Sequence, residues 1–404
     1  MRDCVSVFAL AVLCCVLAGL PPVASVAHDD RCLHRAKVTA IDDSELKKVG
    51  MVEYGTQHLT VEMLTGPGKG NRFPGENEVR AQLDIDKKFA VGDVVTVSWP
   101  GNGPKCGEAL LACDYYRLRW GGVLLGGFVV SLLAFGGWTG LKSLFSFVFS
   151  CFAIWKLLVP LCLKGWDASL ISFVTVSVLT AVIMWLVAGM TRKGLAAFLG
   201  AILGVSASLG LARFFTAVMH VNGATMPFAQ ALLNAGYVNL SLPDIFLGSV
   251  ILASSGAVMD LAMDIAVAIE EVSRHSPSLG RRALLSSGFR VGRSVVGTMT
   301  TTLLLAYSGG YLTLLMVFAA QGTHPIDFLN STLVSAEVVK TLVGSFGLVL
   351  VAPFTAVVSA IVFGGGIKAS GTCGSLSGRC GWFCDISSVG YASGCGVTED
   401  GVAR

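Results

Sequence analysis

Seven long apolar segments limit the folds open to this chain more than any other feature. Most are near the length of about 20 residues that a helix needs to cross the hydrocarbon core of a bilayer. A helix satisfies its own backbone hydrogen bonds in lipid, so the segments favour a bundle of membrane-spanning helices within residues 117–366. The predicted spans are residues 121–138, 143–163, 168–190, 195–218, 244–269, 294–320 and 341–363.

Composition agrees with a membrane protein and excludes several other classes. Only 14% of the 404 residues are charged and 53% are hydrophobic, whereas soluble domains carry about 25% charged residues. The net charge of +3 comes without a block of Lys and Arg, so no nucleic-acid partner is expected. We therefore expect a mainly α, polytopic membrane helix bundle of about seven spans that is surrounded by membrane lipids.

Residues 1–27 have the three parts of a secretory leader. Arg2 precedes the apolar run Val5–Leu20, and two prolines and the small-residue sequence SVA follow. This order predicts a signal peptide that is cleaved after Ala27. An uncleaved signal anchor is the alternative, because sixteen apolar residues can also hold a chain in the membrane. In both cases the chain that follows emerges outside the cytoplasm.

Residues 28–116 contain stretches in which apolar and polar residues alternate, as is typical of short β-strands. The stretches HLTVEML, EVRAQLDI and GDVVTVSW alternate apolar and polar residues, and the turn sequences TGPGKG and FPGEN separate them. We predict a small extracytoplasmic β-rich domain, with an OB-like barrel as the topology. Cys106 and Cys113 enclose a short loop in this domain and are a candidate disulfide, because disulfides form outside the cytoplasm.

Basic residues predict the orientation of the spans, because Lys and Arg are retained on the cytoplasmic side. The outer loops hold only Lys164, with Arg117 and Arg119 as an exception at the outer flank. The inner loops and the tail hold Lys142, Arg192, Lys193, Arg274, Arg281, Arg282, Arg290, Arg293, Lys368 and Arg379. This predicts a protein of the cytoplasmic (inner) membrane with the β-rich domain outside and its carboxyl terminus in the cytoplasm.

The tail, residues 367–404, is rich in Gly, Ser and Cys and is predicted to be disordered and cytoplasmic. Its four cysteines lack the paired short spacing of a zinc site, so neither a metal nor a cofactor is expected.

Two carboxylates interrupt the fifth segment. Asp260 and Asp264 are four residues apart and share one face of a helix. Asp260 lies about 5 Å from the middle of the segment, where a charge is unfavourable by several kcal/mol unless it is paired or hydrated. A cation or proton site is one interpretation. The other places Asp264 at the cytoplasmic interface beside Glu270 and Glu271 and gives Asp260 a structural hydrogen bond.

The sixth segment carries the sequence GTMTTT, in which Thr298 and Thr301 lie at about the depth of the two aspartates by residue counting. The hydroxyls either face the aspartates or bond the backbone of their own helix, as threonines in membrane helices commonly do. Glu337 and Lys340, three residues apart, predict a local ion pair at the start of the last segment. The chain contains no HExxH, GxSxG or Walker A motif, so we do not expect an enzyme.

Four stretches carry a family resemblance. GGWTGLKSLFSF, SSGAVMDLAMDIAVAIEEV, VGRSVVGTMTTTLLLAYSGG and LVGSFGLVLVAPFTAVVSAIV closely resemble the bacterial YibE/F family of multi-pass membrane proteins. The outer segment with its GPGKG turn and the sequence DYYRLRW is similar to the amino-terminal region of that family, whereas the chain after Gly366 lies outside the resemblance. Family members are described as membrane proteins or presumed transporters with no established substrate, so the resemblance implies no catalytic residues. Thr301 stands where the family pattern has Asn.

A fainter likeness to the SecF and resistance-nodulation permease core favours proton-coupled transport or assistance in export, by analogy of fold alone. We therefore predict a permease, transporter or export accessory for an unidentified ion or small-molecule cargo. Its polar intramembrane site would be formed by Asp260, Asp264, Thr298 and Thr301 between the fifth and sixth spans. The alternative is a non-transporting envelope scaffold whose β-rich domain binds a partner protein; a homo-oligomer is compatible with both.

Overall fold

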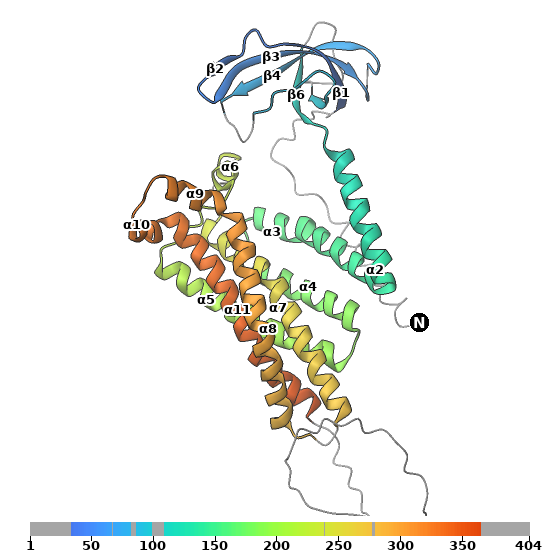
Figure 1. Cartoon of the computed structure of the whole chain (residues 1–404), viewed down its shortest axis with the longest axis vertical. Helices are drawn as coiled ribbons and strands as arrows, with labels where there is room; N and C mark the ends of the chain where they lie inside the picture. Colours follow the sequence, from blue (N-terminus) through green and yellow to red (C-terminus); the bar gives the residue numbers. More distant parts are fainter. Residues whose placement is uncertain are drawn as a thin grey trace, which may run out of the picture. The chain divides into compact units, whose positions relative to one another are not determined.

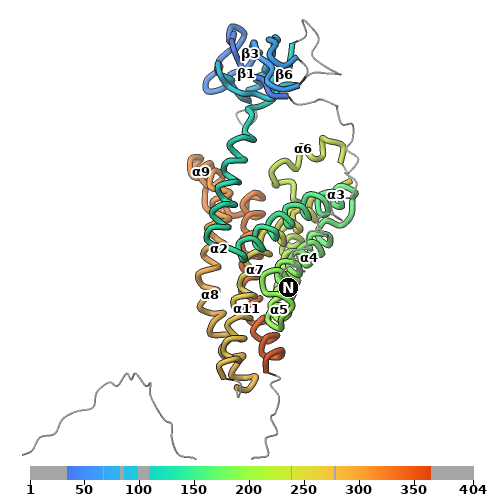
Figure 2. The backbone as a smooth tube through the Cα atoms, turned by 90° about the vertical axis from the view of Figure 1, so that its right-hand side faces the viewer, coloured from blue at the N-terminus to red at the C-terminus, as the bar shows by residue number. Residues whose placement is uncertain are grey.

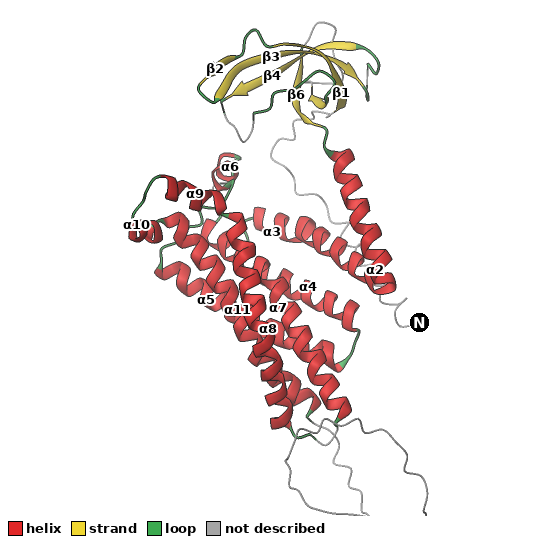
Figure 3. Ribbon diagram, in the orientation of Figure 1, coloured by secondary structure: helices red, strands yellow, loops and turns green. Residues whose placement is uncertain are grey.

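The computed structural model describes residues 34–66, 68–81, 86–98, 109–237, 239–276 and 279–364. Strands come first along the chain and helices follow (Figure 3). The predicted leader, residues 1–27, and the predicted tail, residues 367–404, lie outside the described residues. The strands are β1 (His34–Asp42), β2 (Lys47–Val49), β3 (Val52–Met63), β4 (Arg72–Arg80), β5 (Val94–Ser98) and β6 (Leu110–Tyr115).

The strands form a closed β-barrel, as the sequence predicted. They pair in the order β1-β5-β6-β4-β3, and β1 also pairs with β3, which closes the sheet on itself. β4 and β6 run parallel, whereas the other pairs are antiparallel. β2 extends the edge of β3. Closure of five strands gives the small barrel of the OB-like architecture (Figure 1).

Alternating side chains fill the barrel. Along β3, Leu59, Val61 and Met63 point inward and are at most 3% exposed, because successive residues of a strand face opposite sides of the sheet. Val95 and Val97 of β5 complete the same buried cluster. The apolar and polar alternation read from the sequence therefore corresponds to the inside and outside of the barrel.

Two buried polar side chains of the barrel, Gln57 and Asn77, belong to one hydrogen-bonded network. Gln57 Nε2 donates to Asp43 Oδ1 (2.9 Å) and to the carbonyl oxygen of Phe89 (3.1 Å). Gln57 Oε1 accepts from the Phe89 amide and from Asn77 Nδ2, both at 3.1 Å. Asn77 Nδ2 also donates to the carbonyl oxygen of Lys87 (2.6 Å). The network fastens the segment before β5 to β3 and β4.

The first helical run contains two of the predicted spans. Residues 121–138 and 143–163, which were expected as separate spans, both lie in one run, Leu118–Leu163. It consists of α2 (Leu118–Ala153), a π-helical turn (Ile154–Leu158) and α3 (Val159–Leu163). Gly137 interrupts α2 with φ 49° and ψ −125°, a conformation that glycine adopts readily. The run is bent there into two arms, which Figure 2 shows diverging.

Five further helices form the bundle. They are α4 (Ala168–Ala188), α5 (Arg192–Val218), α7 (Leu242–His275), α8 (Arg281–Gly310) and α11 (Thr332–Phe363). α11 packs against α5, α7 and α8, and α7 also packs against α4 and α5 (Figure 1). Small residues allow close approach: a Cβ on Gly204 of α5 would lie 2.9 Å from Val351 Cβ of α11, and one on Gly288 of α8 2.9 Å from Ala356 Cβ.

The predicted count of seven spans is not confirmed. Five helical segments are long and apolar enough to cross a membrane among the described residues: the run that contains α2, together with α4, α5, α7 and α11. A sixth is added if α8 and α9 (Leu312–Ala320), which meet at 64°, count as one bent span. The short helices α6 (Ala229–Asn234) and α10 (Pro325–Asn330) lie in the connections. The chain is mainly helical, and its apolar helices fit a membrane protein.

Candidate functional site

Helix α7 presents Asp260 and Asp264 on its exposed face. Val258, Leu261 and Ile265 of the same helix are fully buried in the bundle core. Because an α-helix has 3.6 residues per turn, positions 260 and 264 fall on the side away from that core. Both side chains are exposed, and neither carboxylate has a hydrogen bond or ion pair with another described residue. The bundle thus leaves two neighbouring carboxylates open within a helix long enough to span a membrane.

Thr298 and Thr301 lie on α8 and are also exposed. The Thr298 hydroxyl donates to the carbonyl oxygen of Val295 (3.0 Å), and the Thr301 hydroxyl donates to that of Gly297 (3.1 Å). Bonds of this kind, to carbonyls three or four residues back, satisfy a hydroxyl within its own helix. Both threonine hydroxyls thus have hydrogen-bond acceptors in their own helix and need no ligand for this.

Contacts between α7 and α8 show the relative depth of the aspartates and threonines. A Cβ on Gly288 would lie 2.6 Å from Ile269 Cδ1, and one on Gly292 would lie 3.5 Å from Ile265 Cδ1. The helices run antiparallel, so position 260 of α7 is level with about position 297 of α8 by the equal rise per residue. Thr298 therefore shares the depth of Asp260, whereas Asp264 is level with about position 293 and Thr301 lies about one turn beyond position 297. No hydrogen bond joins the aspartates to the threonines in the described chain.

A second polar cluster lies between α8 and α11, towards the carboxyl end of α8. The Tyr307 hydroxyl is buried without a partner among the described residues, and a Cβ on Gly344 would lie 3.1 Å from it. Lys340 Nζ lies 3.3 Å from a carboxylate oxygen of Glu337, which confirms the predicted ion pair. The Thr341 hydroxyl is also buried and has no partner within the described chain. The sequence patterns did not single out Tyr307 and Thr341, because each is only one polar residue in an apolar run.

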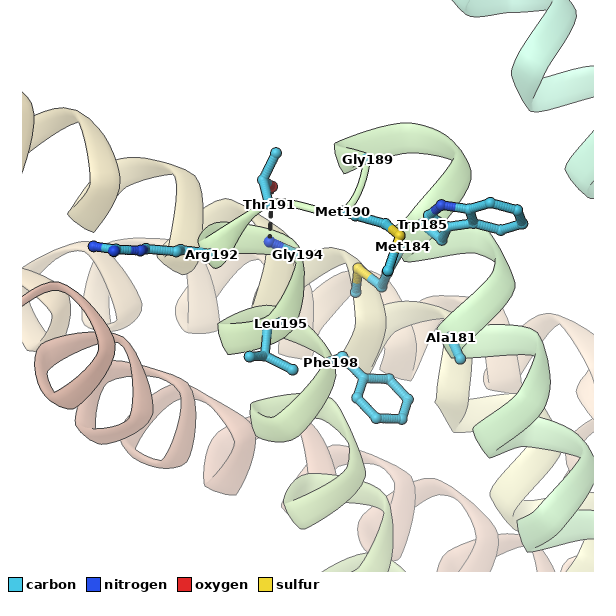
Figure 4. Close-up of a pocket in the computed structure, with 10 residues that line it drawn as sticks. All are labelled: Ala181, Met184, Trp185, Gly189, Met190, Thr191, Arg192, Gly194, Leu195 and Phe198. Carbon is cyan, nitrogen blue, oxygen red and sulfur yellow. Dashed lines mark hydrogen bonds between the residues drawn. The ribbon is translucent and has the colours of Figure 1, made fainter. Parts of the chain in front are cut away.

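The turn between α4 and α5 holds a cavity of about 570 Å³ with an almost wholly apolar lining (Figure 4). Trp185 of α4 and Phe198 of α5 lie on one side, and the Arg192 side chain extends to the other side of the turn. Thr191 Oγ1 accepts a hydrogen bond from the Gly194 amide (3.3 Å) and caps α5. Polar groups do not converge on this cavity, so we do not place a reaction or an ion there.

Arg213 has a structural role at the start of α4. Its Nη2 donates to Ser169 Oγ (2.6 Å) and lies 3.5 Å from Asp167 Oδ2. Burial acts to raise the pKa of Asp167, but hydrogen bonds from Ser169 and the Leu170 amide, with the charge of Arg213, hold this pKa below its ordinary value. The carboxylate thereby caps α4 as an anion and ties it to α5.

The structure offers little for the remaining predicted sites. No three His, Cys, Asp or Glu side chains of the described segments are grouped so that they could hold a metal ion. Cys106 lies outside the described residues, so the Cys106 and Cys113 disulfide stays a prediction. Cys113 Sγ lies 3.3 Å from Ser98 Oγ in the barrel.

Comparison with known protein families identifies the family of the helical region. A family-wide sequence profile described as YibE/F-like protein matches residues 124–365, more than half of the chain. The chain belongs to the YibE/F-like family. The YibE/F-like match begins within α2 and covers all of α4 to α11, but it does not reach the barrel, whose likeness to the family stays a prediction. No curated protein and no solved structure matches the chain.

Proposed function

We propose that this YibE/F-like membrane protein is a permease or export accessory of the cytoplasmic membrane, and that Asp260 and Asp264 form its proton- or cation-binding site. One observation carries the proposal: two carboxylates stand one turn apart on the exposed face of α7 without a partner in the described chain. A charge within the hydrocarbon region is unfavourable by several kcal/mol unless it is paired, hydrated or neutralised. A carboxylate that binds and releases a proton or cation meets that requirement.

Helix α8 supplies the second wall of the proposed site. Thr298 is exposed at about the depth of Asp260 and Thr301 about one turn from it, and their hydroxyl oxygens keep lone pairs after donating to the backbone. Oxygen atoms from a carboxylate and two hydroxyls suit a proton, a small cation or the polar end of a small-molecule cargo. We assign this YibE/F-like protein no catalytic chemistry, cofactor or nucleic-acid partner.

The topology we propose keeps seven spans. The helical run Leu118–Leu163 has 46 residues, about 69 Å at 1.5 Å per residue, which is twice the hydrocarbon thickness of about 30 Å. The bend at Gly137 makes each arm one span, and the bent pair of α8 and α9 counts as another. With the barrel outside, the basic residues around Arg192 and Arg281 then face the cytoplasm, in accord with the positive-inside rule.

A specific observation favours the alternative of an envelope scaffold. The turn between β2 and β3 exposes Met51 by 92%, and Val49 and Tyr54 near it are exposed by 59% and 43%. Apolar side chains gathered at the tip of a hairpin are suited to contact with a partner protein. In this second candidate function the barrel binds an envelope protein, and the helices anchor and assemble the complex.

Substitution of Asp260 by Asn tests the first proposal. We expect Asp260→Asn to lower cargo flux driven by a pH gradient in proteoliposomes by at least about tenfold, because the amide cannot take up a proton in this range. Glu271→Gln is the matched control, since Glu271 is an exposed carboxylate near the end of the same helix, 3.2 Å from His275. Its flux should stay within about twofold of the unsubstituted protein.

Deletion of the barrel separates the two functions. If Asp260→Asn restores every phenotype of a deletion strain while a chain without residues 28–116 restores none, the site on α7 is rejected and the scaffold is supported. The reverse pattern supports the transport site.

A further inference from the structure

Three arginines gather where the chain leaves the barrel and enters α2. Arg35 lies on β1, Arg117 directly precedes α2, and Arg119 lies in its first turn. Arg117 and Arg119 are the exception to the predicted charge asymmetry. The site proposed around Asp260 gives these two arginines no role. Together with Tyr116 and Trp120 the arginines line an open cavity of about 740 Å³. A cationic and aromatic cavity of this size is large enough to hold a small anionic group.

Two of the three arginines keep their charge available. Arg117 Nη1 lies 2.7 Å from Asp114 Oδ1 and is neutralised by it. Arg35 and Arg119 form no ion pair with a described residue. Asp93 also lines the cavity, where its Oδ2 accepts a hydrogen bond from the Ala90 amide (2.8 Å). With Arg117 paired to Asp114, Arg35 and Arg119 still outnumber this one lining carboxylate, so the cavity favours an anion.

Aromatic rings position the two free guanidinium groups. Arg35 Cζ lies 5.0 Å from the ring centre of Tyr116, and Arg119 Cζ lies 5.8 Å from that of Trp120. Stacking on a ring restricts the plane of a guanidinium but leaves its N–H groups free at the edge. That edge matches the oxygen atoms of a phosphate group in a bidentate arrangement.

The lining of the cavity changes from cationic to apolar along α2. Gly121 and Leu124 continue it by one turn, and the Leu124 side chain is 77% exposed. Trp120, at the level between the arginines and Leu124, is 71% exposed. Tryptophan and tyrosine at such a boundary are typical of the membrane interface. The cavity thus has a charged end, an aromatic middle and an apolar end, in the order of the parts of a phospholipid.

We propose that this cavity binds an anionic phospholipid. Arg35 and Arg119 donate to the headgroup phosphate, and an acyl chain follows Leu124 along the exposed side of α2. Because Arg35 belongs to the barrel and Arg119 to the first helix, one lipid joins the domain to the bilayer surface. The inference needs only that α2 enters the membrane, so it does not depend on a transport function for Asp260.

Native mass spectrometry of the full-length protein in detergent tests the site. The protein is titrated with phosphatidylglycerol, with phosphatidylcholine of the same acyl chains, and with inorganic phosphate. We expect phosphatidylglycerol to be retained and the other two to be lost. Arg35→Gln and Arg119→Gln should each lower its affinity about fivefold, and the double variant about 25-fold, since each basic residue near a bilayer surface contributes about that factor.

Arg72→Gln is the matched control, because Arg72 is an exposed arginine at the start of β4 that does not line the cavity. Both tested arginines are exposed, and a circular-dichroism melt of each variant verifies that it is folded. Equal retention of phosphatidylglycerol by the double variant and by Arg72→Gln rejects the site. Equal retention of phosphatidylcholine, or retention of inorganic phosphate, rejects an anionic phospholipid as its ligand.

Discussion

The barrel and the helical bundle differ in how their buried polar side chains are hydrogen-bonded. In the barrel, Gln57 and Asn77 are buried and use their amide groups in one network with the neighbouring backbone. In the bundle, several buried hydroxyls have no hydrogen-bond partner among the described residues: those of Thr175, Thr216, Thr300, Tyr307, Thr341, Thr355 and Ser359. A paired network selects one arrangement of the chain, whereas an unpaired hydroxyl contributes nothing to that choice.

Polar side chains that stabilise the fold also differ from those proposed to act in function. The barrel's polar groups hold its loops in place, so their loss should be measured as lost stability. The exposed carboxylates of α7 make no hydrogen bond or ion pair in the described structure, so their loss should change activity rather than stability. Three further substitutions, ordered from the largest expected effect to the smallest, test this difference.

Removal of the central amide should have the largest effect on stability. Gln57→Ala leaves the Phe89 amide and Asn77 Nδ2 without their buried acceptor, and we expect a loss of about 2–4 kcal/mol in the unfolding free energy of the barrel. Proteolysis of the detergent-solubilised full-length protein at increasing urea concentration measures it. Glu76→Ala, an exposed change on β4, should stay within about 0.5 kcal/mol. A loss below about 1 kcal/mol for Gln57→Ala would contradict the role given to the network.

A smaller effect should appear as a dependence on pH. The hydrogen bond from Gln57, aided by Lys88 against the effect of burial, holds the pKa of Asp43 below its ordinary value of 3.8. A pKa that is lower in the folded than in the unfolded chain stabilises the fold above the unfolded value, and this stability is lost as pH falls through the folded value. The unfolding free energy of the barrel should fall as the pH is lowered from about 5 to about 3. We expect this fall to be smaller in Asp43→Asn than in the unsubstituted protein.

The same proteolysis assay at a series of pH values measures the effect. Glu76→Gln, which removes an exposed carboxylate outside the network, serves as its control. An unchanged pH profile for Asp43→Asn would separate the Asp43 charge from the stability of the barrel.

The smallest effect is expected for an unpaired hydroxyl of the bundle. Thr355 is fully buried on α11, and its hydroxyl has no partner in the described chain. Thr355→Val keeps the shape of the side chain and removes that hydroxyl, so the thermal midpoint in detergent should stay the same or rise slightly. Thr355→Ala, which leaves a small void, should lose about 1 kcal/mol. A clear loss for Thr355→Val would show that the hydroxyl is paired after all and would weaken the comparison.

Much of the fold followed from local patterns. Alternation along HLTVEML, residues 58–64, predicted a strand, and most of this stretch lies in β3 with Leu59 and Val61 inside the barrel. Apolar length predicted α4, α5, α7 and α11. The first two predicted spans lie in one helical run that bends at Gly137, and apolar length alone does not reveal such a bend.

The candidate site was predictable only in part. The spacing of Asp260 and Asp264 was enough to place both carboxylates on one face of a helix. It did not say whether that face would meet the bundle core or its surface, since that depends on which helices pack against α7. Tyr307 was missed because its hydroxyl is buried where α8 meets another helix, close to Gly344 of α11.

The sequence by itself determined the membrane character of the chain, the alternation of the barrel strands and the shared face of the two aspartates. Each of these depends on apolar content or on the period of one strand or helix, which neighbouring residues specify. The tertiary structure alone decided that the barrel closes through β1 and β3, that α11 lies between α5, α7 and α8, and that the aspartates face outward. Those outcomes depend on contacts between residues far apart in the chain, where the fit of small side chains such as Gly204 against Val351 selects one packing.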